Sequence, residues 1–307
     1  MRQDTDGHVT LQNRALHTQR LLDRAVLGIC FGASLVGLFA LAILFAIVLQ
    51  EAYHGAVAYD VGIIRFLTSS GSIDPGRAGF YAAMVGSLWL MVFAALLAFF
   101  VGVGTAVYLV EYAPDTTGTR LIEANLANLA GVPSVVYGLV CLGVLVNGPL
   151  RAGRVILVGA IALGLLVLPI IVVAAMEALR AVPDGMRAGA RAAGATEWQT
   201  VRTVVLPAAM PGIMTGTILA LARAMGETAP LLMVGVLVGA RHPPAGPFDH
   251  ITAMTVTIFE WSFNFQPEFH ALAAMGIVVL LVLLLGMNGV AMYLRYRYRT
   301  VSDRDRP

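Results

Sequence analysis

Six long apolar runs limit most strongly what this chain can fold into. A helix needs about 20 mostly apolar residues to cross the hydrocarbon core of a bilayer. Runs of this kind lie near residues 25–49, 80–110, 125–147, 154–176, 209–240 and 270–294. Only 12% of the residues are charged, about half of the share in a typical soluble domain. The sequence therefore predicts an all-α membrane protein with six transmembrane helices.

The basic residues, all of them arginine, indicate how these helices are oriented. If the six runs are threaded in order, most arginines fall on the side of the membrane that holds both termini. Cytoplasmic segments carry such an excess of positive charge. We therefore expect a cytoplasmic N-terminal tail over residues 1–24, a six-helix domain over 25–294 in contact with membrane lipid, and a cytoplasmic C-terminal tail over 295–307.

Two predicted outer loops, 51–79 and 241–269, lack a continuous helical period and contain several glycines or prolines. This composition predicts short helices or turns. The loops either connect spans or form a docking surface for an external partner. Small residues spaced four apart also allow helices to approach closely, and two such repeats are Gly28-xxx-Gly32 and Gly212-xxx-Gly216.

The cytoplasmic loop 177–207 is predicted to contain two short helices. Asp184 favours the start of the first helix, and Gly194 can end it in a left-handed conformation. Thr196 is a suitable N-cap for the second helix, which Pro207 is expected to end. Two helices joined by a glycine turn would make a compact protrusion, which either links two spans or receives another protein.

The end of this loop resembles a known motif. Gly194 is followed, after nine residues, by Val204-Val205-Leu206-Pro207, which is similar to the second half of the EAA motif of ABC importer permeases. Ala188-Gly189-Ala190 stands where that family has Glu-Ala-Ala. The resemblance implies that the loop forms a coupling helix which fits a groove on a separate ATPase. It assigns this coupling to Ala188, Gly189, Ala190, Gly194, Glu197, Leu206 and Pro207.

Two further stretches resemble the phosphate-specific, PstA-type permeases of the same family. They are GVPSVVYGL, residues 131–139, and ARAMGETAPLL, residues 222–232. The resemblance implies the type I ABC importer permease fold and a role as one half of the membrane pathway of an ATP-driven phosphate importer. It also implies three partners: a second homologous permease, two copies of a cytoplasmic ATPase, and an extracytoplasmic phosphate-binding protein.

Arg223 and Glu227 lie inside an apolar run, where an arginine facing lipid costs roughly 2.5–3.5 kcal/mol. At a rise of ~1.5 Å per residue from Met210, Arg223 lies about 20 Å into the membrane. The spacing of four would place both charges on one helix face. They form either a buried ion pair between helices or a pathway site in which Arg223 receives an anion while Glu227 holds the guanidinium. The planar fork of arginine matches phosphate oxygens.

Breaks in the helical pattern lie beside these charges. Gly226 weakens a helix and Pro230 removes a backbone hydrogen bond, so both favour a kink. The hydroxyl of Thr228 either contacts the anion or satisfies a freed carbonyl. A similar break in the third predicted span comprises Gly131, Pro133 and Ser134. The Ser134 hydroxyl either contacts substrate or bonds to its own helix, as serines in spans often do.

The sequence lacks the G-x-x-x-x-G-K-[ST] phosphate cradle. We therefore expect no cofactor in this chain, with ATP and magnesium bound by the partner ATPase. No catalytic or metal-ligating set is evident, and a net charge of +2 does not suggest nucleic acid. Three alternatives compete with phosphate import: import of sulfate, molybdate or a phosphonate, a passive anion channel, and an intramembrane enzyme acting on lipid phosphates.

Overall fold

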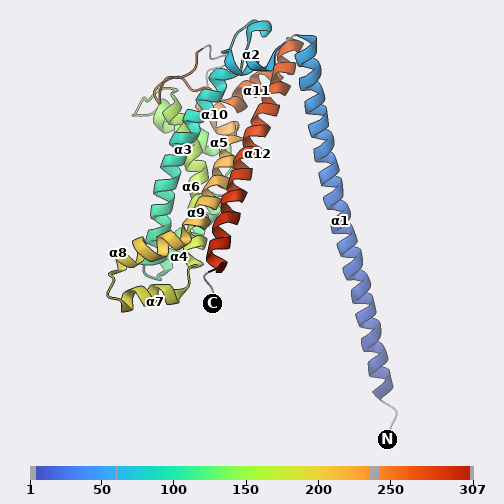
Figure 1. Ribbon diagram of the computed structural model, residues 1–307, viewed down its shortest axis with the longest axis vertical. Helices are drawn as coiled ribbons and strands as arrows, with labels where there is room; N and C mark the ends of the chain where they lie inside the picture. The colour runs from blue at the N-terminus through green and yellow to red at the C-terminus, as the bar shows by residue number, and fades with distance from the viewer. Residues whose placement is uncertain (1–4, 60, 236–241, 305–307) are drawn as a thin grey trace. The chain divides into compact units, whose positions relative to one another are not determined.

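The computed structural model describes residues 5–59, 61–235 and 242–304, and these residues form helices joined mostly by short turns (Figure 1). Three π-helical turns, Tyr108–Tyr112, Leu142–Val146 and Val201–Val205, continue or join α-helices. The helices are α1 Thr5–Ala58, α2 Ile63–Thr68, α3 Tyr81–Val107, α4 Thr117–Leu129, α5 Ser134–Cys141, α6 Ile156–Arg180, α7 Asp184–Ala192, α8 Glu197–Thr200, α9 Leu206–Met225, α10 Ala229–Val234, α11 Met254–Ser262 and α12 Pro267–Arg304.

Five of the described helical segments are long and apolar enough to cross a membrane, and a bent pair supplies a sixth candidate span. The expected all-α membrane fold is therefore confirmed. The bent pair contains the third predicted span, 125–147, and confirms the break expected there at Gly131, Pro133 and Ser134, because α4 and the helix that starts at Ser134 meet at 100°. Pro133 explains the bend, since a proline disfavours helical backbone at the residue before it, here Val132.

The fifth predicted span, 209–240, is also interrupted. Helix α9 ends at Met225, and the short helix α10 ends at Val234, where Gly235 caps it with a φ of 89° that few other residues adopt. Residues 236–241 of this prediction lie outside the described residues. Helix α9 ends at Met225 because of Gly226 and Pro230, and not because the sequence becomes less apolar.

Helical backbone continues past the apolar runs into both predicted tails. Helix α1 begins at Thr5, inside the predicted tail 1–24, and α12 reaches Arg304, inside the predicted tail 295–307. The outer loops do contain short helices, as expected: α2 and the 3₁₀ turn Pro75–Arg77 in the first, and α11 in the second.

The chain divides into two compact units, Met1–Glu51 and Ala52–Pro307. The first unit consists mainly of the larger part of α1. In the second unit, α6 lies between α3 and α9 and is the most buried of the candidate spans. Figure 1 shows α7 and α8 at one end of this bundle and α2 and α11 at the other.

The repeat Gly212-xxx-Gly216 allows α9 to pack directly on α6. A Cβ atom added to Gly212 would lie 2.8 Å from the Cβ of Ala178, and one added to Gly216 would lie 2.6 Å from the Cβ of Ala174. Both distances are well below van der Waals contact, at which carbon atoms are about 3.5–4 Å apart. The close approach of two helices expected from this repeat is therefore confirmed.

We predict that G216A lowers the melting temperature of the purified protein in detergent, because the added methyl group separates α9 from α6. Overpacking of this kind costs about 1–3 kcal/mol. The matched control is G104A in α3, where an added Cβ would meet no atom within 4 Å. Equal melting temperatures for the two variants would contradict the packing described here.

Candidate functional site

The segment after Arg223 is a complete break between two helices. The last turn of α9 is closed by bonds to the carbonyl three residues back: Gly226 N donates to Arg223 O and Glu227 N donates to Ala224 O, both at 3.1 Å. Helix α10 then begins with Pro230 in its first turn, where the missing N–H is not needed. The expected kink beside the charges is thus an interruption of the helix.

Arg223 and Glu227 form a loose ion pair. The Arg223 Nε and Glu227 Oε1 atoms are 3.8 Å apart, which is beyond hydrogen-bond length. The Arg223 side chain is 58% exposed and that of Glu227 is 22% exposed. Because α9 ends at Met225, the two residues do not share one helix face, in contrast to the spacing argument. The pair is therefore not a buried lock between helices of this chain.

Glu227 lines a small, mostly apolar gap beside α3 and α11. The Ser87 hydroxyl accepts a hydrogen bond from Met254 N at 2.9 Å, and the Thr255 hydroxyl lies 3.5 Å from the Glu227 carbonyl oxygen. The cavity lined by Ser87, Glu227 and Thr255 has a volume of about 10 Å³. Such a space holds at most about one water. A tetrahedral anion at Arg223 would therefore lie on the outer surface of this chain.

Helix α5, which follows the break in the third span, packs against α10, which follows the break after α9. A Cβ atom added to Gly138 of α5 would lie 2.5 Å from the carbonyl oxygen of Pro230 in α10. Ser134 precedes Gly138 by four residues and so lies on the same face of α5. The structure thus brings together the two stretches that contain the predicted pathway residues. Gly138 was missed in the sequence, where it is one of many glycines in apolar runs.

Other predicted pathway residues have defined places. Gly131 and Pro133 are exposed in the turn between α4 and α5. The Tyr137 hydroxyl donates to the Leu129 carbonyl across this turn at 2.8 Å. Thr228 occupies the N-cap position of α10, but its side chain makes no capping hydrogen bond. The turn is therefore stabilised by Tyr137, whereas neither proposed use of the Thr228 hydroxyl is tested.

The cytoplasmic loop folds as two capped helices. Gly194 has a φ of +87°, and Ala195 N and Gly194 N donate to the carbonyls of Ala190 and Arg191, a pattern known as the Schellman motif. Thr196 then caps α8 through a capping box. Both predicted caps are confirmed. Among the predicted coupling residues, Ala188 and Gly189 of α7 and Glu197 of α8 are exposed.

The predicted helix end at Pro207 is wrong. Helical backbone continues from Glu197 to Met225, and Leu206 and Pro207 form the start of α9. A proline inside a helix normally collides with the carbonyl four residues earlier. The wider π-helical turn Val201–Val205 lies directly before Pro207 and changes this hydrogen-bonding pattern, so the helix accommodates the ring.

A buried ion pair connects the loop to α3. Arg187 Nη2 lies 2.9 Å from Glu111 Oε1, and only 11% and 8% of the two side chains are exposed. The hydrogen bond to Glu111 raises the pKa of Arg187 above its ordinary value. Removing one partner of a buried pair costs about 3–5 kcal/mol. The two residues are 76 positions apart, so no local sequence spacing reveals this contact.

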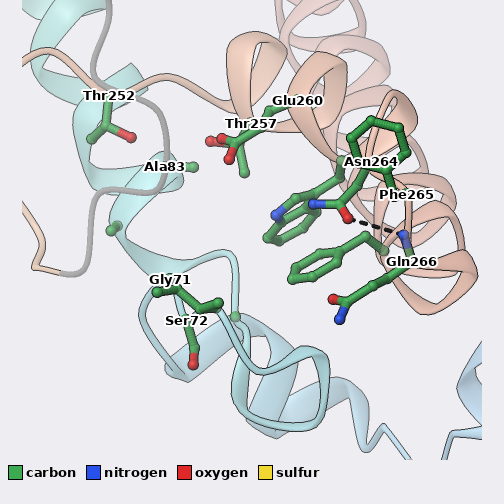
Figure 2. A pocket seen from close by; sticks show the side chains of 14 residues that line it. Gly71, Ser72, Ala83, Thr252, Thr257, Glu260, Asn264, Phe265 and Gln266 are labelled. Atoms are coloured by element: carbon green, nitrogen blue, oxygen red, sulfur yellow. Dashed lines mark hydrogen bonds between the residues drawn. The ribbon is translucent and has the colours of Figure 1, made fainter.

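An outer pocket lies at the end of the bundle opposite α7, with a volume of about 410 Å³. Figure 2 shows that Thr257 and Glu260 of α11 line one side and Ser72 lines another, with Asn264 and Gln266 beside them. Gln266 N donates to Asn264 Oδ1 at 3.1 Å. The pocket combines residues of both outer loops and does not include Arg223.

Multiple apolar spans, a break with charged residues inside one of them and an exposed pair of capped helices define a membrane transport subunit. The chain belongs to the family of binding-protein-dependent transport system inner membrane components, whose model matches residues 127–300. It is therefore an ABC importer permease subunit and a multi-pass protein of the bacterial inner membrane, a transport component and not an enzyme.

Relatives and solved structures agree with this assignment. The chain is 35% identical over 237 residues to a probable ABC transporter permease protein, YqgH, of Bacillus subtilis strain 168, covering 72% of this chain and 74% of that protein. It is 43% identical over 164 residues to the phosphate transport system permease protein PstA 1 of Mycobacterium tuberculosis, covering 53% and 52%. A structure of the MetNI methionine ABC transporter shares the fold at 17% identity, with a TM-score of 0.57 and coverage of 71% and 96%.

We predict that G194A destabilises the end of α7, because an alanine adopts the left-handed backbone only at a cost of roughly 1 kcal/mol. Hydrogen exchange of the amides of residues 194 and 195 should become faster. G189A in the same helix is the matched control, since an added Cβ there meets no atom within 4 Å and alanine favours helix. Unchanged exchange in G194A would contradict the capped geometry.

Proposed function

We propose that this permease subunit imports inorganic phosphate and forms one half of the translocation pathway. The observation that carries the proposal is the exposure of Arg223 at the depth of a transmembrane span. An arginine facing lipid is unfavourable, and the cavity that Glu227 lines within the described residues, about 10 Å³, is too small for a tetrahedral anion. A second, homologous permease covering this surface would complete a polar pathway around the guanidinium.

The loose contact with Glu227 suits transient binding of an anion. Arg223 can donate two parallel hydrogen bonds to phosphate oxygens. When phosphate is absent, the carboxylate of Glu227 partly neutralises the charge of the Arg223 guanidinium. When phosphate is bound, the same negative charge repels it and so favours its release. Because Nε and Oε1 are 3.8 Å apart, phosphate need not break a hydrogen bond between these atoms to reach the arginine.

The break between α9 and α10 supports a gate at the same place. Gly226, Glu227 and Thr228 separate the two helices, Pro230 lies in the first turn of α10, and Gly138 leaves α10 in direct contact with α5. Movement of α9 relative to α10 would change the position of Arg223 and the space beside Ser134. We infer that Gly131 and Pro133 serve the corresponding bend of the third span.

Two copies of a cytoplasmic ATPase would supply the energy, and they would hold the ATP and magnesium. Exposed Met186 and Trp198 on α7 and α8 support docking of a protein at this end, because exposed apolar groups often mark interaction sites. Closure of the ATPases would open the permeases outward to receive phosphate from an external binding protein. Hydrolysis would return them to the inward-facing state.

We predict that R223Q reduces high-affinity phosphate uptake by cells at least about tenfold, since losing a charged hydrogen-bonding partner costs about 1.5–3 kcal/mol or more. The control is R120Q, which breaks a bidentate ion pair with Asp115 on the exposed surface. Undiminished uptake by R223Q at normal expression would contradict the role assigned to Arg223.

Competition in a reconstituted uptake assay tests the substrate. Unlabelled phosphate should suppress uptake of labelled phosphate, whereas the same concentration of sulfate, molybdate or a phosphonate should not. A single arginine does not distinguish tetrahedral anions, so the partner permease and the binding protein must supply selectivity. Stronger competition by one of the other anions would assign that anion as the substrate.

A further inference from the structure

Helix α7 has few side chains that attach it to the membrane helices. Of its nine residues, only Arg187 and Ala190 are not exposed. The alanine contributes only a methyl group, whereas Arg187 reaches into the protein. Arg187 therefore supplies the polar side-chain contact between α7 and the membrane helices, in addition to the packing of α7 against the π-helical turn Val201–Val205.

The Arg187 guanidinium joins three segments. Its Nη2 donates to Glu111 Oε1 and to the Leu179 carbonyl, each at 2.9 Å, and its Nη1 donates to the Val182 carbonyl. Glu111 belongs to the π-helical turn that extends α3, and Leu179 belongs to the end of α6. A planar guanidinium bound on several sides has a fixed orientation. The contact therefore fixes α7 to the cytoplasmic ends of both helices.

We infer that Arg187 and Glu111 are positioning residues that make α7 and the cytoplasmic end of α3 move as one body. This inference rests on the proposed function, in which an ATPase docks on α7 and α8. Displacement of α7 would then move α3, which packs on α6, and α6 packs on the Arg223-bearing helix α9. The route is a chain of direct contacts, which is the kind of connection that can carry coupling between distant sites.

The test uses the complete importer, with both permeases, the ATPase and the binding protein, in proteoliposomes. The measured quantity is the number of phosphate ions taken up per ATP hydrolysed. R187Q and E111Q should still hydrolyse ATP, but this ratio should fall about tenfold, a typical size for coupling between sites. R120Q, which breaks the exposed pair with Asp115, should retain the wild-type ratio.

Two variants separate coupling from simple stability. E111Q keeps the size of the side chain and one acceptor oxygen, so its complex should assemble. R187K keeps the charge but loses the planar fork, so its ratio should lie between those of wild type and R187Q. Assembled R187Q and E111Q complexes with the wild-type ratio would overturn the inference.

Failure of the proposed function gives different results. If the wild-type complex takes up sulfate instead of phosphate, the proposed substrate is wrong. The number of sulfate ions taken up per ATP hydrolysed would then still test the role of Arg187 and Glu111. A wild-type chain that transports without any ATPase would contradict both the proposed function and this inference.

Discussion

The cost of placing a charge inside a membrane governs the arrangement around Arg223. A guanidinium at this depth needs polar surroundings, yet in this chain its side chain is largely exposed and its contact with Glu227 is loose. Packing within the chain does not satisfy it. The polar surroundings must come from water, an anion or another subunit, and the proposed pathway between two permeases would supply all three.

The break after α9 places Arg223 and Glu227 beside backbone that is not helical. A continuous α9 would have kept its backbone groups paired internally and Glu227 on the helix face of Arg223. Instead, the break after Met225 leaves backbone at membrane depth outside regular helix, which is tolerated where it is buried in protein or lines a polar cavity. The contact between Gly138 and Pro230 shows that protein covers one side of this break.

Much of the fold follows from local sequence signals. Apolar runs predicted the spans, and Gly194 and Thr196 predicted the caps of α7 and α8, because caps depend on one or two residues and their neighbours. A break at Gly131, Pro133 and Ser134 was predicted, but its size, a bend of 100°, and the continuation of the helix through Pro207 were not. A proline can either end a helix, as Pro133 does, or be accommodated after a π-helical turn, as Pro207 is. Tertiary packing decides which of the two conformations forms. Nor can local spacing reveal the contact between Glu111 and Arg187, which joins distant segments.

The central claim is that Arg223 faces a pathway between two permeases and binds the transported anion. A structure of the assembled importer with bound phosphate tests this most directly. The account predicts phosphate oxygens at about 2.8 Å from the Arg223 guanidinium, on the surface that the second permease covers. Two results would contradict it. In one, the Arg223 side chain faces lipid. In the other, it is enclosed by protein and does not contact phosphate in either the outward-facing or the inward-facing state.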